Sequence, residues 1–230
     1  MFRRSLMPTK KILISGAGIA GLGLARQLKK LHIPFKIIEK RTHLSTDGAG
    51  IALPANAVKA LRYMGLGNNV DQHTHQVNKI IYTDSTGTTL SEASLLVEPL
   101  NTDRFVALHR HKFHDILREG VDGAIHFSTT INQITRTKNG VLVKFNNPEL
   151  KEEEFSAVIG ADGIKSHVRQ LAFADTPLTD LGVTIWRWTC KYPTHDLQPT
   201  YMLGARDIFM AYPIGKDESI VMHMLLSLKT

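Results

Sequence analysis

The sequence has very little cysteine and no hydrophobic run long enough to cross a bilayer. Its 230 residues include one cysteine, Cys190, so an intrachain disulfide and a cysteine-based metal cluster are both excluded. A reducing cytoplasm is the simplest compartment for such a chain. The apolar run at residues 12–25 is too short for a membrane span, and its four glycines are untypical of a secretory signal. We therefore expect a cytoplasmic protein that does not insert into membranes.

Positive charge exceeds negative charge mainly near the N-terminus. The formal net charge is +7, and residues 1–50 hold ten basic side chains against two acidic ones. Such a segment suits an anionic ligand such as a pyrophosphate, and a solvated basic helix face explains it equally well. Nucleic acid is not an expected partner, because no basic stripe is interleaved with aromatic residues. A hydrophobic fraction of 43% and a charged fraction of 21% are ordinary for a globular protein and argue against disordered, collagen-like and coiled-coil classes.

The first forty residues predict a strand, a helix and a second strand. Residues 11–15 and 35–39 are short apolar runs, and the leucines within 19–31 recur at helical spacing. Two strands joined by one helix form a βαβ unit, in which the strands run parallel.

The rest of the chain changes character near residue 175. Before that point, the remaining helices are predicted at residues 56–64, 111–119 and 166–171. The remaining strands are predicted at residues 79–83, 88–93, 104–108, 131–137, 141–145, 155–160, 183–190, 200–203, 208–212 and 219–226. Asp84–Gly87 and Lys138–Gly140 predict hairpin turns, and the charged residues 151–154 predict a solvated turn. We therefore predict an α/β domain at 1–175 and part of a mostly antiparallel sheet at 176–230.

A glycine-rich turn joins the first predicted strand to the first predicted helix. It matches G-x-G-x-x-G in the required setting and consists of Gly16, Ala17, Gly18, Ile19, Ala20 and Gly21. Gly16 permits the tight turn, Gly18 lets a pyrophosphate approach the backbone, and Gly21 lets the helix pack closely on the strand. The helix N-terminus supplies free N–H groups for phosphates. Glu39 ends the second strand, where a carboxylate accepts hydrogen bonds from ribose hydroxyls and repels a 2′-phosphate, which argues against NADP in this site.

The βαβ unit leaves FAD and NAD both open, and further segments bear on the choice. Gly160–Arg169 includes Asp162 and Gly163 and resembles the Asp-Gly motif of flavoprotein aromatic hydroxylases. Arg110, at the end of a predicted strand, follows the pattern of the same family, as do Glu39-Lys40-Arg41 and Gly48–Leu53. Together these segments resemble the single-component FAD-dependent monooxygenases, similar to p-hydroxybenzoate hydroxylase, over about residues 10–226.

The resemblance implies a function and a set of cofactor contacts. FAD would lie extended, with its pyrophosphate at residues 16–21 and its adenosine at Glu39, Lys40 and Arg41. Arg110 would contact the phosphate and ribityl region, and Asp162 and Gly163 would serve FAD binding and the use of a visiting NADPH or NADH. The flavin would carry the chemistry, transferring one oxygen atom of dioxygen to an aromatic small molecule, so no separate catalytic triad is expected.

Plainer interpretations stand beside these assignments. Arg110 fits a surface position at a helix start, and Asp162-Gly163 fits a tight turn that closes a strand. His109 and His111 are expected to point apart, because one belongs to a strand and the other to a helix, so no metal site is expected. Trp186 and Trp188 alternate on a strand and share one face, where they line a substrate cavity or pack on the sheet.

The resemblance also implies a difference in length. Family members are longer, and a Gly-Asp motif in their later part contacts the cofactor; no Gly-Asp segment follows Gly163 here. The last strand, at 219–226, is expected to lie at an open sheet edge that suits a complementing chain or a second copy. Three functions remain open: a truncated monooxygenase, a non-catalytic flavin-binding remnant or half of a split enzyme, and an NAD-dependent dehydrogenase.

Overall fold

The computed structural model describes residues 11–44, 49–173, 177–191, 197–215 and 218–226. Contacts divide the chain into two units, each built from two separate segments. Unit 1 comprises residues 1–45 and 117–178, and unit 2 comprises residues 46–116 and 179–230. The chain thus passes into unit 2 twice. The predicted boundary near 175 lies close to the second passage, whereas the first passage has no counterpart in the prediction. The division into a domain at 1–175 and part of a second domain at 176–230 stays a prediction.

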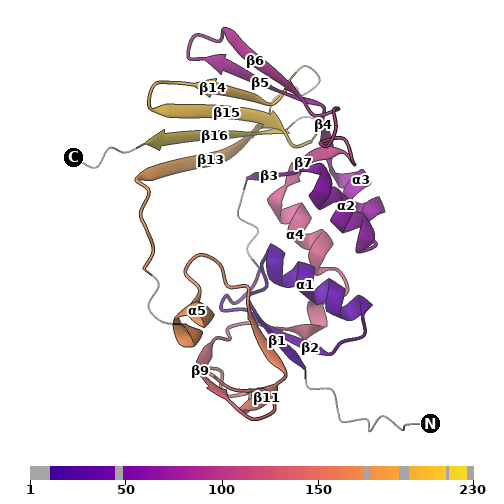
Figure 1. The fold of residues 1–230 in the computed structure, drawn as a ribbon, viewed down its shortest axis with the longest axis vertical. Coiled ribbons are helices and arrows are strands. Elements are labelled where there is room, and N and C mark those ends of the chain that lie inside the picture. The colour runs from indigo at the N-terminus through magenta and orange to yellow at the C-terminus, as the bar shows by residue number, and fades with distance from the viewer. Residues whose placement is uncertain (1–10, 45–48, 174–176, 192–196, 216–217, 227–230) are drawn as a thin grey trace. The chain divides into compact units, whose positions relative to one another are not determined.

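Unit 1 is built on a four-stranded parallel sheet in the order β12-β1-β2-β8. Its strands are β1 (Ile12–Ser15), β2 (Phe35–Ile38), β8 (Ile125–His126) and β12 (Ala157–Gly160). Helix α1 (Ile19–Lys30) joins β1 to β2, as Figure 1 shows. The predicted βαβ unit is confirmed. Ser15 lies opposite both Ile38 and Gly160, so three strands end at one edge of the sheet.

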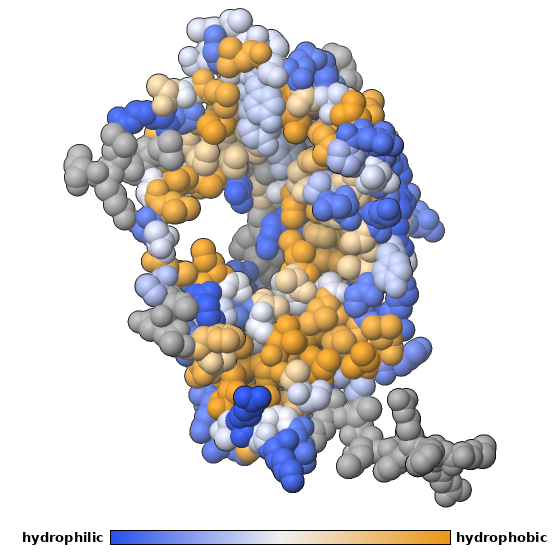
Figure 2. Space-filling view, in the orientation of Figure 1, coloured by the Kyte–Doolittle hydropathy of each residue, from blue (hydrophilic) through white to orange (hydrophobic). Residues whose placement is uncertain are grey.

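The core of unit 1 explains why these strands form a buried sheet. Leu13 and Ile38 pack with Val143 and Phe155 of a second sheet, with Val143, Phe155 and Leu13 fully buried. Each such side chain contributes about 1.5–3 kcal/mol when it is fully buried. The second sheet is antiparallel and has the order β11-β10-β9. Its strands are β9 (Ile131–Arg136), β10 (Val141–Phe145) and β11 (Glu153–Phe155). Figure 2 shows apolar residues gathered over the part of unit 1 that holds α1, β1 and β2.

The predicted strand at 155–160 and the predicted turn at 151–154 are wrong in detail. The structure has two strands here, because β11 includes Glu153 and pairs with β10, while β12 pairs with β1 in the parallel sheet. Ser156, between them, donates its amide to the Lys11 carbonyl (3.0 Å). Glu153 is held in β11 by ion pairs to Lys11 and Lys36, so this part of the charged run is sheet and not turn.

Unit 2 contains a six-stranded sheet in the order β13-β16-β15-β14-β5-β6 and a three-stranded sheet in the order β3-β7-β4. The strands of the larger sheet are β5 (Lys79–Asp84), β6 (Thr89–Ser94), β13 (Val183–Lys191), β14 (Thr200–Leu203), β15 (Asp207–Pro213) and β16 (Glu218–Leu226). Those of the smaller sheet are β3 (Gly50–Leu53), β4 (His75–Val77) and β7 (Phe105–His109). Within the larger sheet, β14 and β5 pair in parallel and the other pairs among the described residues are antiparallel, so the predicted mostly antiparallel sheet is confirmed.

The expected open edge lies elsewhere in this sheet. Strand β16 was predicted to lack neighbours, and that prediction is wrong, because β16 pairs with β13 on one side and β15 on the other. The sheet ends instead at β13 and β6 (Figure 1). The order is not sequential: the chain forms β5 and β6 first, returns at the other end of the sheet with β13, and later places β16 between β13 and β15.

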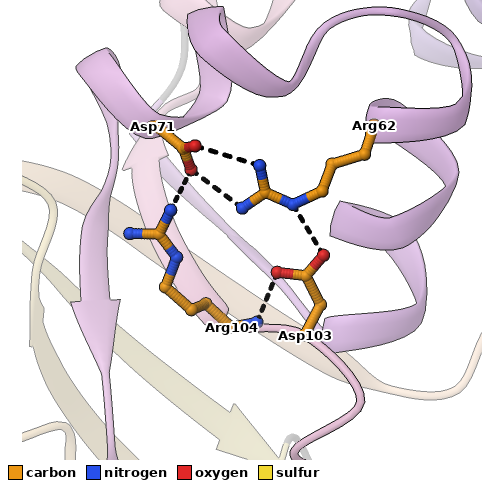
Figure 3. A network of polar contacts seen from close by, with 4 residues as sticks. All are labelled: Arg62, Asp71, Asp103 and Arg104. Atoms are coloured by element: carbon orange, nitrogen blue, oxygen red, sulfur yellow. Dashed lines mark hydrogen bonds and ion pairs between the residues drawn. The ribbon is translucent and has the colours of Figure 1, made fainter.

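A network of charged side chains joins two helices of unit 2, α2 (Ala55–Tyr63) and α3 (Gly67–His73), to the residues just before β7. Arg62 donates two hydrogen bonds to Asp71, both 2.9 Å, and a third to Asp103 at 2.7 Å (Figure 3). Arg104 also pairs with Asp71. Hydrogen bonds from Arg62 lower the pKa of Asp71 below its ordinary value. The bidentate geometry fixes α3 against α2.

Two further helical segments complete the structure. They are α4 (Arg110–Arg118) and α5 (His167–Ala172), with a short 3₁₀ turn at Asp122–Ala124. No helix within the described residues is long and apolar enough to cross a membrane.

Candidate functional site

The glycine turn of unit 1 has the geometry that the sequence predicts. Gly16 has φ of +109°, and a Cβ placed there would lie 2.4 Å from the carbonyl oxygen of Ala161. A Cβ at Gly21 would lie 1.9 Å from the carbonyl oxygen of Gly16. Both positions therefore require glycine for backbone packing: Gly16 against the segment that follows β12, and Gly21 against the turn itself.

Gly18 is different, because the space beside it is open. No atom lies within 4 Å of a Cβ placed at Gly18, and its backbone is extended, with φ of −79°. Gly18 is also the N-cap of α1, where the amide groups of the first turn have no partner within the helix. An open, side-chain-free approach to a helix N-terminus is what a phosphate group needs. Ile19 and Ala20 form that first turn.

Glu39 connects this turn to the end of β2. Its Oε2 accepts a hydrogen bond from the Ala17 amide (2.9 Å), and its Oε1 accepts one from the Arg41 amide (3.0 Å). A carboxylate has about four acceptor positions, so two bonds leave capacity for ribose hydroxyls. Lys40 and Arg41 are exposed beside it. The structure thus brings Glu39 to the glycine turn, at the edge where parallel sheets bind their ligands.

Asp162 lies at the same edge, after β12, but its carboxylate is engaged with the protein. Oδ1 accepts from the Ser166 hydroxyl (2.6 Å), and Oδ2 accepts from the amides of His167 (2.7 Å) and Val168 (3.1 Å). Burial raises the pKa of Asp162, but these hydrogen bonds outweigh burial and hold the pKa below its ordinary value. Asp162 therefore fixes the first turn of α5, and Gly163 follows with φ of +84°.

Two residues of this arrangement were missed by the sequence assignment of the site. Ser166 caps α5 by accepting from the Arg169 amide (3.0 Å) while it donates to Asp162. Its signal was available, since serine before a helical run is a common N-cap. Ala161 contacts Gly16 through its backbone, which no side-chain pattern could reveal.

Arg110 belongs to unit 2, where it begins α4 directly after β7. Its amide donates to the carbonyl of Ala49 (3.0 Å), and its side chain is exposed. The side chain is thus available to a ligand. The structure places Gly16, Glu39 and Asp162 together within unit 1, and places Arg110 in unit 2.

The histidines near Arg110 differ from expectation. His109 and His111 were expected to point apart, and that is wrong: their ring centroids lie 5.0 Å apart. The helix begins immediately after the strand ends, so the chain turns sharply and the rings meet. His109 also pairs with Glu218 (2.5 Å). Within the described residues, no three His, Cys, Asp or Glu side chains form a group that could hold a metal ion.

Comparison with protein families bears on which cofactor the chain binds. A family model described as "FAD binding domain" matches residues 9–227. The chain belongs to this FAD-binding family. The choice between FAD and NAD, which the βαβ unit left open, is thereby decided for FAD. The open approach at Gly18 and the acceptor capacity of Glu39 fit the pyrophosphate and ribose of that cofactor.

Several curated relatives of the FAD-binding chain are named monooxygenases, and two others are named a synthase and a hydroxylase. The 2-heptyl-3-hydroxy-4(1H)-quinolone synthase of Pseudomonas aeruginosa is 31% identical over 189 residues, covering 81% of this chain and 48% of the relative. The 3-hydroxybenzoate 6-hydroxylase 1 of Aquipseudomonas alcaligenes is 30% identical over 191 residues, covering 76% of this chain and 46% of the relative. The chain therefore spans about half the length of the curated relatives it matches.

Solved structures show the same fold. PqsL of P. aeruginosa in complex with 2-aminobenzoylacetate matches with a TM-score of 0.83 and 20% identity, covering 95% of this chain and 61% of PqsL. Klebsiella pneumoniae HpxO in complex with FAD and uric acid matches with a TM-score of 0.83 and 21% identity, covering 96% and 57%. The predicted α/β fold class is confirmed.

Proposed function

We propose that residues 11–41 hold the ADP half of FAD and that the chain is the FAD-binding part of a monooxygenase. The observation that carries the proposal is the open approach to Gly18 beside the Glu39 carboxylate. Phosphates would accept from the α1 amides, and the ribose hydroxyls would donate to Glu39. Lys40 and Arg41 would add positive charge at the adenosine end. Oxygen transfer is the chemistry that FAD would supply, and the chain would bind and orient it.

The reductant, substrate and compartment belong to the proposal. A nicotinamide cofactor, NADPH or NADH, would visit to reduce the flavin. The substrate class would be an aromatic or polycyclic small molecule, because relatives include a 3-hydroxybenzoate hydroxylase and a quinolone synthase. Cys190 is the single cysteine, which favours the cytoplasm. A non-catalytic flavin-binding remnant, or one half of a split enzyme, is the alternative, and NADPH consumption with hydroxylated product is the measurement that separates the two.

Asp162 and Gly163 would support cofactor binding mainly by positioning the backbone beside the glycine turn. The carboxylate is committed to α5, and the adjacent Ala161 carbonyl contacts Gly16. The Asp-Gly segment would therefore shape the glycine turn from the neighbouring strand. The FAD affinity of Asp162→Asn tests whether Asp162 also contacts FAD directly.

Arg110 would bind an anionic part of the cofactor. An arginine near a phosphate makes charge-assisted hydrogen bonds, worth about 1.5–3 kcal/mol each. Arg110→Ala should therefore weaken FAD binding about tenfold or more, since about 1.4 kcal/mol corresponds to a factor of ten. The measurement is a flavin-fluorescence titration of both proteins.

Lys112→Ala is the matched control, because Lys112 is also an exposed cation on α4. It should leave FAD affinity unchanged apart from a small electrostatic loss. Equal small losses in the two variants would make Arg110 an ordinary surface residue and would remove it from the site.

A further inference from the structure

The chain leaves β8 at the same edge of the parallel sheet at which it leaves β2. The two strands run parallel, with Ile38 opposite His126, so Glu39 and the residues after His126 both follow strand ends at the edge that carries the glycine turn. Parallel sheets bind their ligands at this edge. The segment at 126–129 is therefore a neighbour of the carboxylate that is proposed to meet the ribose.

Three backbone hydrogen bonds fasten the main chain around Glu39 to this segment. The Glu39 amide donates to the His126 carbonyl, and the Thr129 amide donates to the Glu39 carbonyl, both at 2.9 Å. The Ser128 amide donates to the Arg41 carbonyl, also at 2.9 Å. The segment thus holds both backbone polar groups of Glu39 and fixes the main chain from which its carboxylate extends.

The segment keeps Ser128 in an unfavourable backbone conformation. Its φ is +51°, in the left-handed region that residues with a Cβ rarely adopt. Such a conformation persists when the surrounding contacts hold it, and it is found preferentially at functional sites. Ser128 is itself exposed, so packing of its own side chain does not explain its conformation. The contacts of the next residue explain it.

The Thr129 hydroxyl braces this turn. Thr129 is 1% exposed, and its hydroxyl donates to the Phe127 carbonyl (2.7 Å), which closes the turn across Ser128. The same oxygen accepts from the side-chain amide of Asn147 (3.2 Å), which leaves its proton directed at Phe127. Without the hydroxyl, Ser128 is free to relax toward ordinary backbone angles, and the two amides turn away from the carbonyls that they hold.

We propose that Thr129 is a positioning residue for the ribose site of the cofactor, because its hydroxyl holds the strained turn that fixes Glu39. The inference rests on the proposed function, in which Glu39 accepts from the ribose of FAD. Glu39 also accepts from the Ala17 amide (2.9 Å), so a shift of its main chain alters its contact with the glycine turn as well. Hydrogen bonds weaken steeply with poor geometry, so such a shift weakens recognition of the ribose hydroxyls.

The test compares ADP with 2′-deoxy-ADP, each competing with FAD in a flavin-fluorescence titration. The two probes differ in the 2′-hydroxyl, so the ratio of their affinities reports the bond to Glu39 and cancels any loss of folded protein. We expect the parent chain to bind ADP about tenfold more tightly, which corresponds to about 1.4 kcal/mol. Glu39→Ala should bind both probes equally.

Thr129→Val keeps the shape of threonine and lacks the hydroxyl, so it should reduce the preference for ADP to about threefold or less. Thr129→Ser keeps the hydroxyl and should keep the preference. Asn147→Ala frees the hydroxyl proton from its direction toward Phe127 and should give an intermediate preference. It replaces Thr129→Val in the test if the valine variant does not fold, and a full tenfold preference in Asn147→Ala then overturns the inference.

Thr137→Val is the matched control. The Thr137 hydroxyl also donates to a carboxylate and accepts from a backbone amide within unit 1, at the turn between β9 and β10, so its loss should leave the preference unchanged. A folded Thr129→Val chain with the parent's preference, or an equal loss in Thr137→Val, overturns the inference and leaves the ribose site standing. A parent chain without any preference overturns the ribose site and the inference together, so the two failures are distinguishable.

Discussion

Replacing Asp162 with alanine should destabilise unit 1 by removing three hydrogen bonds at the start of α5. The carboxylate accepts from the Ser166 hydroxyl and from the amides of His167 and Val168, at 2.6, 2.7 and 3.1 Å. Loss of a helix-capping side chain costs about 0.5–2 kcal/mol, and a hydrogen bond to a charged group contributes about 1.5–3 kcal/mol before solvent screening. Because Asp162 is only partly buried, we expect a loss of about 2 kcal/mol in the free energy of unfolding.

The stabilisation by Asp162 should depend on pH in a definite direction. The folded-state pKa of Asp162 lies below its ordinary value of 3.8. The stabilisation is therefore present above pH 3.8 and is lost as the pH falls through the lower folded-state pKa. The gap in unfolding free energy between the parent chain and Asp162→Ala should narrow over that interval. Urea unfolding followed by circular dichroism measures this gap at neutral pH and at about pH 3.

Asp122→Ala is the control for this experiment. Asp122 pairs with Arg118 on the surface, and its side chain is 55% exposed, so its loss should cost less than about 1 kcal/mol. If Asp162→Ala is no less stable than Asp122→Ala, the capping role is refuted. Asp162→Asn keeps an acceptor at this position and should keep FAD affinity. A large loss of affinity in Asp162→Asn, with stability retained, would show direct contact with the cofactor.

Two further predictions concern packing and charge. Gly21→Ala should lower the urea midpoint of unfolding markedly, because its Cβ would lie 1.9 Å from the Gly16 carbonyl oxygen. The control is Gly23→Ala, which has open space around its Cβ and should not lower that midpoint. Equal midpoints for the two variants would contradict the close helix packing. Arg62→Met should cost about 1–2 kcal/mol at neutral pH in urea unfolding. Asp71 has a pKa below 3.8, so this cost should fade as the pH drops through that lower value, and a cost independent of pH would contradict the network.

Local patterns in the sequence predicted the parts of the fold that depend on neighbouring residues. The leucines of α1 and the two flanking apolar runs gave the βαβ unit, because helix period and strand runs are local properties. Asp84 is an example for turns: its Oδ1 accepts from the amides of Thr86 and Thr88, and the predicted hairpin forms around it.

Long-range pairing was beyond local patterns. The mainly apolar run at 155–160 did not reveal that β11 and β12 join different sheets, since that depends on which partner strand is near. For the same reason, β16 was predicted at an edge and lies inside its sheet. Strand β3 and helix α3 were missed, because each is short and lacks a strong period.

For the candidate site too, features set by neighbouring residues were predicted, and features set by distant residues were not. The glycine spacing and Glu39 predicted that the turn and this carboxylate lie together, and the structure joins them through the Ala17 amide, because that motif lies within one βαβ unit. The commitment of the Asp162 carboxylate to α5 could not be predicted, because the sequence does not show which amides a carboxylate meets.

The central claim is tested most directly by titrating FAD, followed by flavin fluorescence, into the parent chain, Gly18→Val and Gly23→Val. Both glycines have open space beside them and neither has a positive φ, so a valine fits at either position without a clash. At Gly18 a branched side chain would occupy the place where the pyrophosphate must touch the backbone. We predict that Gly18→Val loses at least about tenfold in FAD affinity, or about 1.4 kcal/mol, while Gly23→Val retains it. Equal affinity for FAD in Gly18→Val and Gly23→Val would contradict the assignment of this turn to the cofactor.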